Sequence, residues 1–165
     1  MLISLVFGLV FLSCVVVIAR DDWAFGIVPD YPLLALGAAG AAFAFCDPEA
    51  SYTSALETFE QLAARAAILG FFGYSVAVLF RLIRGRDGLG LGDVKLMAAA
   101  GVWSPTLSGF YAITSASVAA LVLALGAQAW RGQSPALTEA LPFALFLGPT
   151  FFAFWVFERM NLLSP

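Results

Sequence analysis

The stretch that decides the fold is Leu2–Ala19, LISLVFGLVFLSCVVVIA, which contains no charged residue. A helix of this length crosses the hydrocarbon core of a bilayer, which is roughly 30 Å thick. The first basic residue, Arg20, follows the run, and no Lys or Arg precedes it. A secretory signal peptide carries its positive charge before the apolar run. The sequence therefore predicts a retained first membrane span with the N-terminus outside.

The rest of the chain continues this pattern. Apolar residues make up 62% and charged residues 12% of the sequence, values outside the range of soluble globular proteins. They predict one membrane-embedded domain over residues 1–165, an all-α polytopic protein with about six transmembrane helices. The expected spans are residues 2–19, 31–46, 62–83, 93–103, 107–130 and 140–158. Ser104-Pro105 ends the short fourth run, and the alternative joins residues 91–130 into one span plus an interfacial piece.

The basic residues indicate the orientation. With the N-terminus outside, six of the eight basic residues lie at the inner side: Arg20, Arg81, Arg84, Arg86, Lys95 and Arg131. Arg65 and Arg159 remain at the outer side. This distribution follows the positive-inside tendency. It predicts a multi-pass membrane protein with the N-terminus outside.

The longest outer connection lies between the second and third spans. Asp47-Pro48 stops the second span, and Ser54 stands three residues before Glu57, which is capping-box spacing. Apolar residues then recur at helical intervals. The pattern predicts an interfacial helix that leads into the third span.

The missing residue types exclude several kinds of site. The chain has no histidine, which removes Ser-His-Asp and Cys-His nucleophiles and His-based zinc proteases. Cys14 and Cys46 lie in apolar runs and are interpreted as small core residues, so neither a disulfide nor a metal site is expected. A Ser-Lys pair through Lys95 needs a deprotonated amine, which Asp93 two residues away disfavours. No cofactor and no nucleic-acid partner are expected.

Two acidic segments stand at the ends of apolar runs. Asp21-Asp22 closes the first run, and Gly88–Gly92, GLGLG, leads to Asp93 at the start of the fourth. An ionisable group at membrane depth is costly and marks a functional site by default. Two carboxyl groups that share a proton are sufficient for peptide hydrolysis by acid–base chemistry. The alternative is a glycine-rich turn in which Asp93 is only the N-cap of a helix.

These residues resemble a known family. Arg81–Leu96 resembles the GxGD region of the type IV prepilin peptidases, which are intramembrane aspartyl proteases. Asp93–Ala99 is similar to the residues usual in that family at and after the aspartate. Asp22 is followed by Val28-Pro29-Asp30 where the family has Ile-Pro-Asn. Leu141–Gly148 resembles the proline-phenylalanine segment of its last span. The resemblance implies a GxGD-type architecture in the cell (inner) membrane.

The resemblance also has departures. Asp30 replaces the usual asparagine, and Ala144 and Leu145 stand where glycine and proline are common. Asp21 is one residue out of register with the first motif. The chain has no Cys-x-x-Cys pair, so it resembles the peptidase-only form without the zinc and methyltransferase insert.

The resemblance implies a site and a substrate. It makes Asp22 and Asp93 the catalytic pair. Residues that shape the site or bind substrate would be Gly90, Gly92, Lys95, Pro29, Pro142 and Phe143. The substrates would be prepilin-like membrane proteins with a short basic leader, a glycine before the cut and an apolar helix after it. The cut would fall at the cytoplasmic face, where acidic Asp21 and Asp30 attract the leader.

Helix dipoles suggest different roles for the two aspartates. Asp22 ends a helix, where negative charge is disfavoured, and Asp93 begins one, where it is favoured. The expectation is a protonated Asp22 that polarises the scissile carbonyl and an ionised Asp93 that activates water. Lys95 and Arg20 either hold one proton state or anchor the protein at the interface.

The competing function class is a small transporter, or a pilus or secretion assembly subunit, whose aspartates bind a cation or proton. The fifth and sixth spans offer mainly Ser and Thr hydroxyls, and no acid lies between Asp93 and Glu139. This favours a single two-carboxylate site. The sequence does not fix the oligomeric state.

Overall fold

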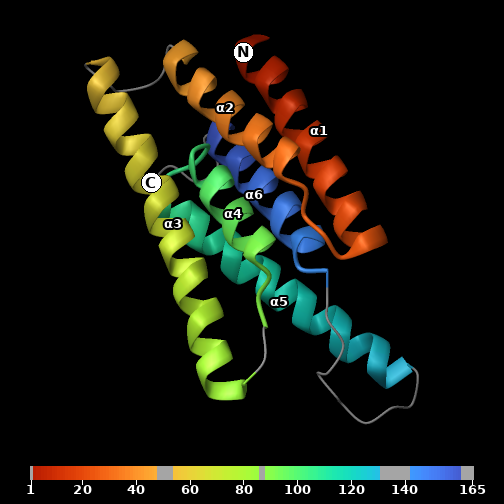
Figure 1. Cartoon of the computed structure of the whole chain (residues 1–165). Coiled ribbons are helices and arrows are strands. Elements are labelled where there is room, and N and C mark those ends of the chain that lie inside the picture. Colours follow the sequence, from red (N-terminus) through yellow and green to blue (C-terminus); the bar gives the residue numbers. More distant parts are fainter. Residues whose placement is uncertain (1, 48–53, 86–87, 131–141, 161–165) are drawn as a thin grey trace.

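The computed structural model describes residues 2–47, 54–85, 88–130 and 142–160, and this part of the chain forms six α-helices. In chain order they are α1 (Leu2–Phe25), α2 (Asp30–Cys46), α3 (Ala55–Arg84), α4 (Leu91–Gly101), α5 (Thr106–Trp130) and α6 (Ala144–Arg159). The chain reverses direction from each helix to the next (Figure 1). The prediction of an all-helical chain is confirmed for the described residues, and helices satisfy their backbone polar groups internally, as lipid requires.

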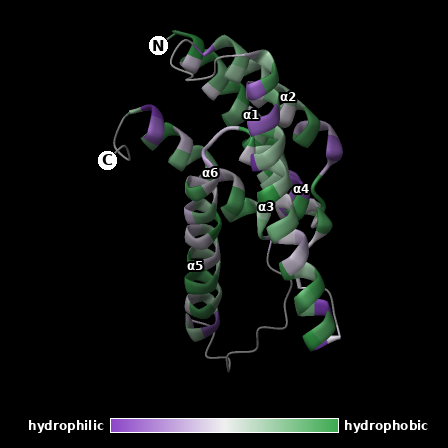
Figure 2. Cartoon of the chain, turned by 90° about the vertical axis from the view of Figure 1, so that its left-hand side faces the viewer, coloured by the Kyte–Doolittle hydropathy of each residue, from purple (hydrophilic) through white to green (hydrophobic). Residues whose placement is uncertain are grey.

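Three helices are long and apolar enough to cross a membrane, namely α1, α3 and α5 with 24, 30 and 25 residues. α2 is a shorter apolar helix, and the ribbons are coloured as hydrophobic over most of their length (Figure 2). α4 has 11 residues. At 1.5 Å per residue it rises about 16 Å, roughly half of a hydrocarbon core. α4 is therefore too short to make a full crossing by itself.

The first helix is longer than the sequence suggested. The expected span ended at Ala19, but α1 continues through Asp22 to Phe25. Charged side chains do not by themselves end a helix. α1 ends at Gly26, which has φ 63°, and the Gly26 N–H donates to the Asp22 carbonyl oxygen over 2.9 Å. The left-handed conformation that glycine adopts easily thus sets the end of α1.

The expected start of the third helix is confirmed. The Ser54 hydroxyl accepts a hydrogen bond from the Glu57 N–H over 3.1 Å. The helix expected to lead into the span at 62–83 is present and is continuous with it, because α3 runs without a break from Ala55 to Arg84. No glycine or proline stands near the expected junction to interrupt it.

The later boundaries agree more closely. α4 ends at Gly101 and α5 begins at Thr106, so the predicted break at Ser104-Pro105 is confirmed. The sixth run was expected over 140–158. Residues 140 and 141 lie outside the described part, and α6 begins at Ala144.

An aromatic cluster fills the half of the bundle nearer the N-terminus of α1. Phe11, Phe43, Trp103 and Trp155 are buried there, with ring centroids of Phe11 and Trp103 4.5 Å apart and of Phe43 and Trp103 5.8 Å apart. The indole Nε1 of Trp103 donates to the Leu36 carbonyl oxygen over 3.0 Å. The cluster thereby joins α1, α2 and α6 to the turn that follows α4.

Polar contacts close the same end. Arg159 of α6 pairs with Asp47 after α2, and its guanidinium lies 4.6 Å from the centre of the Phe43 ring. Next to it in α6, Glu158 accepts a hydrogen bond from Ser108 of α5. This network, together with the aromatic cluster, fixes the ends of α2 and α6 and the start of α5.

The opposite half of the bundle is less enclosed. α3 and α5 diverge toward their C-terminal ends in both views (Figures 1 and 2). In α3 the last buried residue is Gly73, and the large apolar side chains beyond it are exposed. These are Tyr74, Val76, Val78, Leu79, Phe80, Leu82 and Ile83.

The two cysteines differ in environment. Cys14 is buried within the core and Cys46 is exposed at the end of α2, and both are free thiols. The interpretation as a core residue therefore agrees with the structure for Cys14 and was wrong for Cys46. An apolar run does not reveal which side of a helix faces lipid.

Candidate active site

Two buried carboxyl groups lie near one another in the bundle, Asp22 in the last turn of α1 and Asp93 in the first turn of α4. The exposed fraction is 7% for Asp22 and 8% for Asp93. The carboxyl groups are close enough for the charge of Asp22 to act on Asp93. Burying a carboxyl group is costly unless hydrogen bonds compensate. The surroundings of each group show which bonds do so.

Asp22 receives its hydrogen bonds from another helix. The backbone N–H groups of Ala144 and Leu145, at the start of α6, donate to its carboxyl group. The first N–H groups of a helix have no partner within the helix and bind anions readily. Pro142 and Phe143 come directly before these donors and are half-buried, and Phe143 packs against the hydrophobic core. The start of α6 is thus fixed next to Asp22.

Asp93 is bound by its own helix. It is the third residue of α4, and the N-cap is Gly90, so the interpretation of Asp93 as the N-cap was wrong. The Gly90 backbone N–H bonds to the Asp93 carboxyl group, which is one half of a capping box. A Cβ at Gly90 would lie 3.3 Å from Asp93 Oδ2. Gly90 is exposed and has no side chain, so the backbone next to Asp93 is accessible.

Each carboxyl group keeps one buried oxygen without a hydrogen-bond partner among the described residues, Oδ2 of Asp22 and Oδ1 of Asp93. A buried polar atom of this kind calls for an explanation, such as a bound water or a catalytic role. Backbone bonds orient both groups.

The segment between α1 and α2, Gly26–Pro29, packs against the first turn of α4. A Cβ at Gly92 would lie 2.6 Å from Val28 Cβ, so the absence of a side chain at Gly92 permits this contact. Three residues further along α4, Lys95 Nζ lies 2.6 Å from Asp30 Oδ1 at the start of α2. The structure thus brings the two acidic motifs of the sequence together.

The remaining candidates lie around this centre. Lys95 pairs with Asp30, and Arg20 is exposed at the end of α1. Pro29 is the half-buried N-cap of α2. Asp21 is half-buried whereas Asp22 is buried, as expected if Asp22 is the residue in register.

Two features of the site were not predicted from the sequence. The donors at Ala144 and Leu145 were noted only as departures from the resembling family, in which proline, with no N–H, is common at the position of Leu145. The Asp30–Lys95 pair joins residues 65 positions apart. Its one signal was an acid where the resembling family has asparagine.

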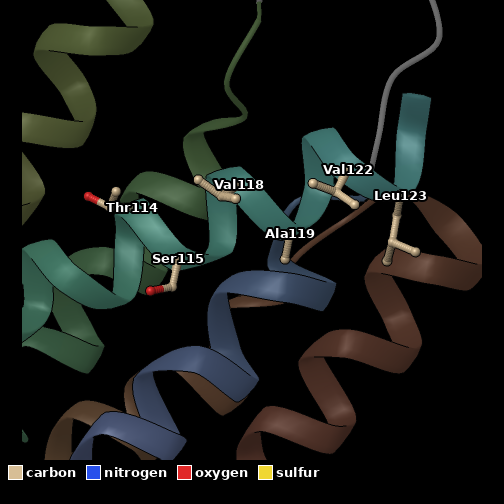
Figure 3. A pocket seen from close by; sticks show the side chains of 6 residues that line it. All are labelled: Thr114, Ser115, Val118, Ala119, Val122 and Leu123. Carbon is tan, nitrogen blue, oxygen red and sulfur yellow. The ribbon is translucent and has the colours of Figure 1, made fainter. Parts of the chain in front are cut away.

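A pocket elsewhere on the surface does not include these residues. It runs along α5 and is open to the outside (Figure 3). Its lining residues are Thr114, Ser115, Val118, Ala119, Val122 and Leu123. Asp22 and Asp93 are not part of it, so the carboxyl pair remains the candidate centre.

Comparisons with known proteins agree on one family. The model of the type IV leader peptidase family matches residues 9–125. A prepilin leader peptidase/N-methyltransferase of Dichelobacter nodosus is 32% identical over 149 residues, which cover 88% of this chain and 46% of that protein. A protein of the same name in Burkholderia pseudomallei strain 1026b is 39% identical over 95 residues, which cover 54% of this chain and 29% of that protein. Another in Klebsiella pneumoniae is 35% identical over 102 residues, which cover 61% of this chain and 41% of that protein.

The chain spans less than half the length of these curated relatives. No solved structure matches it. The family match covers α2, α3, α4 and most of α1 and α5, and therefore includes both Asp22 and Asp93.

Proposed function

The chain belongs to the type IV leader peptidase family, and on that premise we propose that it is an intramembrane aspartyl endopeptidase that removes the leader from prepilin-like precursors. The observation that carries the proposal is the pair of buried carboxyl groups of Asp22 and Asp93, each with one oxygen that has no hydrogen-bond partner in the described part of the chain. The relatives named prepilin leader peptidase/N-methyltransferase support the substrate class.

The proposed chemistry uses a water molecule between the two groups. One ionised carboxylate takes a proton from the water molecule as the water oxygen attacks the scissile carbonyl carbon. The protonated carboxyl group of the other aspartate gives its proton to the carbonyl oxygen. The C–N bond then breaks as the first carboxyl group protonates the leaving nitrogen. The second carboxyl group regains its proton from the hydrated carbonyl. The pair therefore returns to its starting state, which holds one proton.

The helix ends alter the division of roles expected from the sequence. Asp22 lies in the last turn of α1, which disfavours its negative charge. However, Ala144 and Leu145 at the start of α6 donate to it, and a helix start favours negative charge. Asp93 also lies at a helix start. Because helix dipoles do not separate the two, we assign the proton to the pair as a unit.

We further propose that the six helices form one peptidase unit of the inner membrane. The N-terminus lies outside and the carboxyl pair at the cytoplasmic face. The basic residues support this orientation, because Arg20 near the end of α1 and Arg81 and Arg84 in the last turn of α3 follow spans that run toward the same side as the first half of α4, which carries Asp93 and Lys95. The short α4 enters from that side and is enclosed by α2, α3, α5 and α6. It places Asp93 near the interface, where water and a leader peptide have access.

The transporter alternative has less support. A proton path needs a series of polar groups that exchange partners across the bilayer. The hydroxyls of Thr114 and Ser117 donate to Phe110 and Ile113 in their own helix, and Thr150 also donates within α6. Bonds of this kind satisfy a hydroxyl in lipid without forming a path.

The decisive experiment replaces each aspartate by its isosteric amide. We expect Asp22→Asn and Asp93→Asn each to abolish processing of a precursor with a basic leader, a glycine and an apolar helix. Either change removes half of the acid–base pair and keeps the size of the side chain. The matched control is Asp21→Asn. It should retain processing because, of the two neighbours Asp21 and Asp22, only Asp22 is buried.

Processing is followed by the size shift of the precursor, with detergent-solubilised variants checked for an unchanged elution volume. Full activity of Asp93→Asn would refute the proposed function. An inactive Asp21→Asn with an active Asp22→Asn would move the first catalytic position by one residue.

A further inference from the structure

The ion pair between Asp30 and Lys95 lies next to the carboxyl pair and is not used by the chemistry above. Resting on the proposed function, we propose that the Asp30–Lys95 pair is a positioning latch that holds the segment Gly26–Pro29 against α4 and so sets the approach of Asp22 to Asp93.

The geometry gives two points of attachment. Gly92 and Lys95 are three residues apart and therefore share one face of α4. Val28 packs on Gly92, and Asp30 pairs with Lys95, whose Nζ lies 2.6 Å from Asp30 Oδ1. Asp93 lies between the two attachment points along the helix.

The attached segment is short. Four residues connect the end of α1 to the start of α2, and Asp22 lies in the last turn of α1. A shift of Asp30 along α4 therefore moves the end of α1, and with it Asp22. Displacing a catalytic group by about 1 Å can cost on the order of a hundredfold in rate.

The pair is placed where it can be altered without disturbing the core. The side chains of Lys95 and Asp30 are 57% and 66% exposed. An exposed ion pair typically changes an equilibrium by a factor of about five or less. We therefore expect loss of the pair to have a moderate effect and charge repulsion a larger one.

Charge exchange tests the latch. Lys95→Glu and Asp30→Lys each set like charges against one another, and we expect each to lower kcat about tenfold with KM changed less than about twofold. The double variant Asp30→Lys with Lys95→Glu restores the attraction and should recover kcat to within about threefold. The matched control is Arg84→Glu, an exposed charge reversal in the last turn of α3, which should keep kcat.

Salt supplies a second readout. Screening weakens an exposed ion pair, because the Debye length falls from about 10 Å at 0.1 M to about 3 Å at 1 M salt. We expect kcat of the unaltered protein to fall with added salt. The Asp30→Asn variant, which carries the residue usual in the resembling family, should show a smaller salt effect. This variant also serves if a charge reversal prevents folding.

The outcomes separate the latch from other roles. A double variant as slow as the single ones, or salt effects equal in Asp30→Asn and the unaltered protein, would overturn the latch. A raised KM with unchanged kcat would show instead that Asp30 binds the basic leader directly. If the latch variants keep full kcat while Asp93→Asn is inactive, only the latch is rejected. If Asp93→Asn is active, the proposed function fails first.

Discussion

Gly92 illustrates how a single side-chain position controls the site. A Cβ added at Gly92 would lie 2.6 Å from Val28 Cβ, so the absence of a side chain at Gly92 leaves room for Val28. Real Cβ atoms essentially never approach so closely, so either Val28 or α4 would have to move. The neighbour of Gly92 in the helix is Asp93, and therefore the contact is transmitted to the carboxyl pair.

We expect Gly92→Ala to lower the processing rate about ten- to a hundredfold, because the added methyl displaces Val28 and misplaces Asp22 relative to Asp93. The control is Gly126→Ala in α5, where a Cβ meets nothing within 4 Å. That change should keep activity and stabilise the helix by about 0.5–1 kcal/mol. The rate of precursor cleavage and the thermal unfolding midpoint are measured for both. Full activity of Gly92→Ala would show that the contact with Val28 does not matter.

At this scale the sequence pointed to Asp22 and Asp93, both of which are buried, whereas Asp21, which is out of register with the family motif, is half-buried. Charged residues in an apolar chain stand out, and the spacing from Asp22 to Pro29 gave the register. It did not predict the donors to Asp22, because the N–H groups of Ala144 and Leu145 belong to a backbone that only tertiary packing brings to α1.

At the scale of elements, α4 depends on close contact with α3. Glycines on both helices form the interface, where a Cβ at Gly101 would lie 2.9 Å from Leu69 Cδ1 and 3.2 Å from the Arg65 carbonyl oxygen. In lipid, small residues of this kind let helix backbones approach closely and gain packing energy. The position of Asp93 therefore depends on the whole length of α4, including its far end.

We expect Gly101→Leu to destabilise the protein by about 1–3 kcal/mol and to reduce processing, because a backbone oxygen cannot move aside as a side chain can. Gly126→Leu is the matched control, since the same side chain there points into open space and should leave both properties nearly unchanged. The measurement is thermal unfolding in detergent together with the cleavage rate. Equal unfolding midpoints for the two variants would contradict this account of the interface.

The sequence predicted the existence of the six helices better than their ends. Glycine and proline signals located the breaks after α3 and before α5. The end of α1 was missed, because the charged residues at 20–22 were interpreted as a boundary whereas the helix ends at Gly26. Polarity marks where a helix leaves lipid, and backbone conformation marks where it stops.

At the scale of the whole molecule, the proposed orientation is tested by labelling. In a Cys14→Ala, Cys46→Ala background, single cysteines are introduced at positions 52, 85, 133 and 162. A membrane-impermeant thiol reagent applied to intact cells should label 52 and 162 and reach 85 and 133 only after the membrane is opened. The reason is that six of the eight basic residues then lie inside.

Position 162 is the informative one. If it is protected while 52 is labelled, the chain crosses the membrane an odd number of times. The end of α6 would then lie at the inner side of the membrane, opposite to the side that the proposed orientation gives it.

The two ends of the bundle are held together unequally, and this has a mechanical consequence. Arg159, Glu158 and the aromatic cluster fix one end, whereas near the carboxyl pair the last turns of α3 and α5 diverge. Within α1 the cluster holds Phe11, and the helix rises about 16 Å from Phe11 to Asp22. A tilt of 5° about Phe11 would move the end of α1 at Asp22 by about 1.4 Å. Because helices tilt to match bilayer thickness, we expect the thickness of the surrounding membrane to alter the separation of the two aspartates.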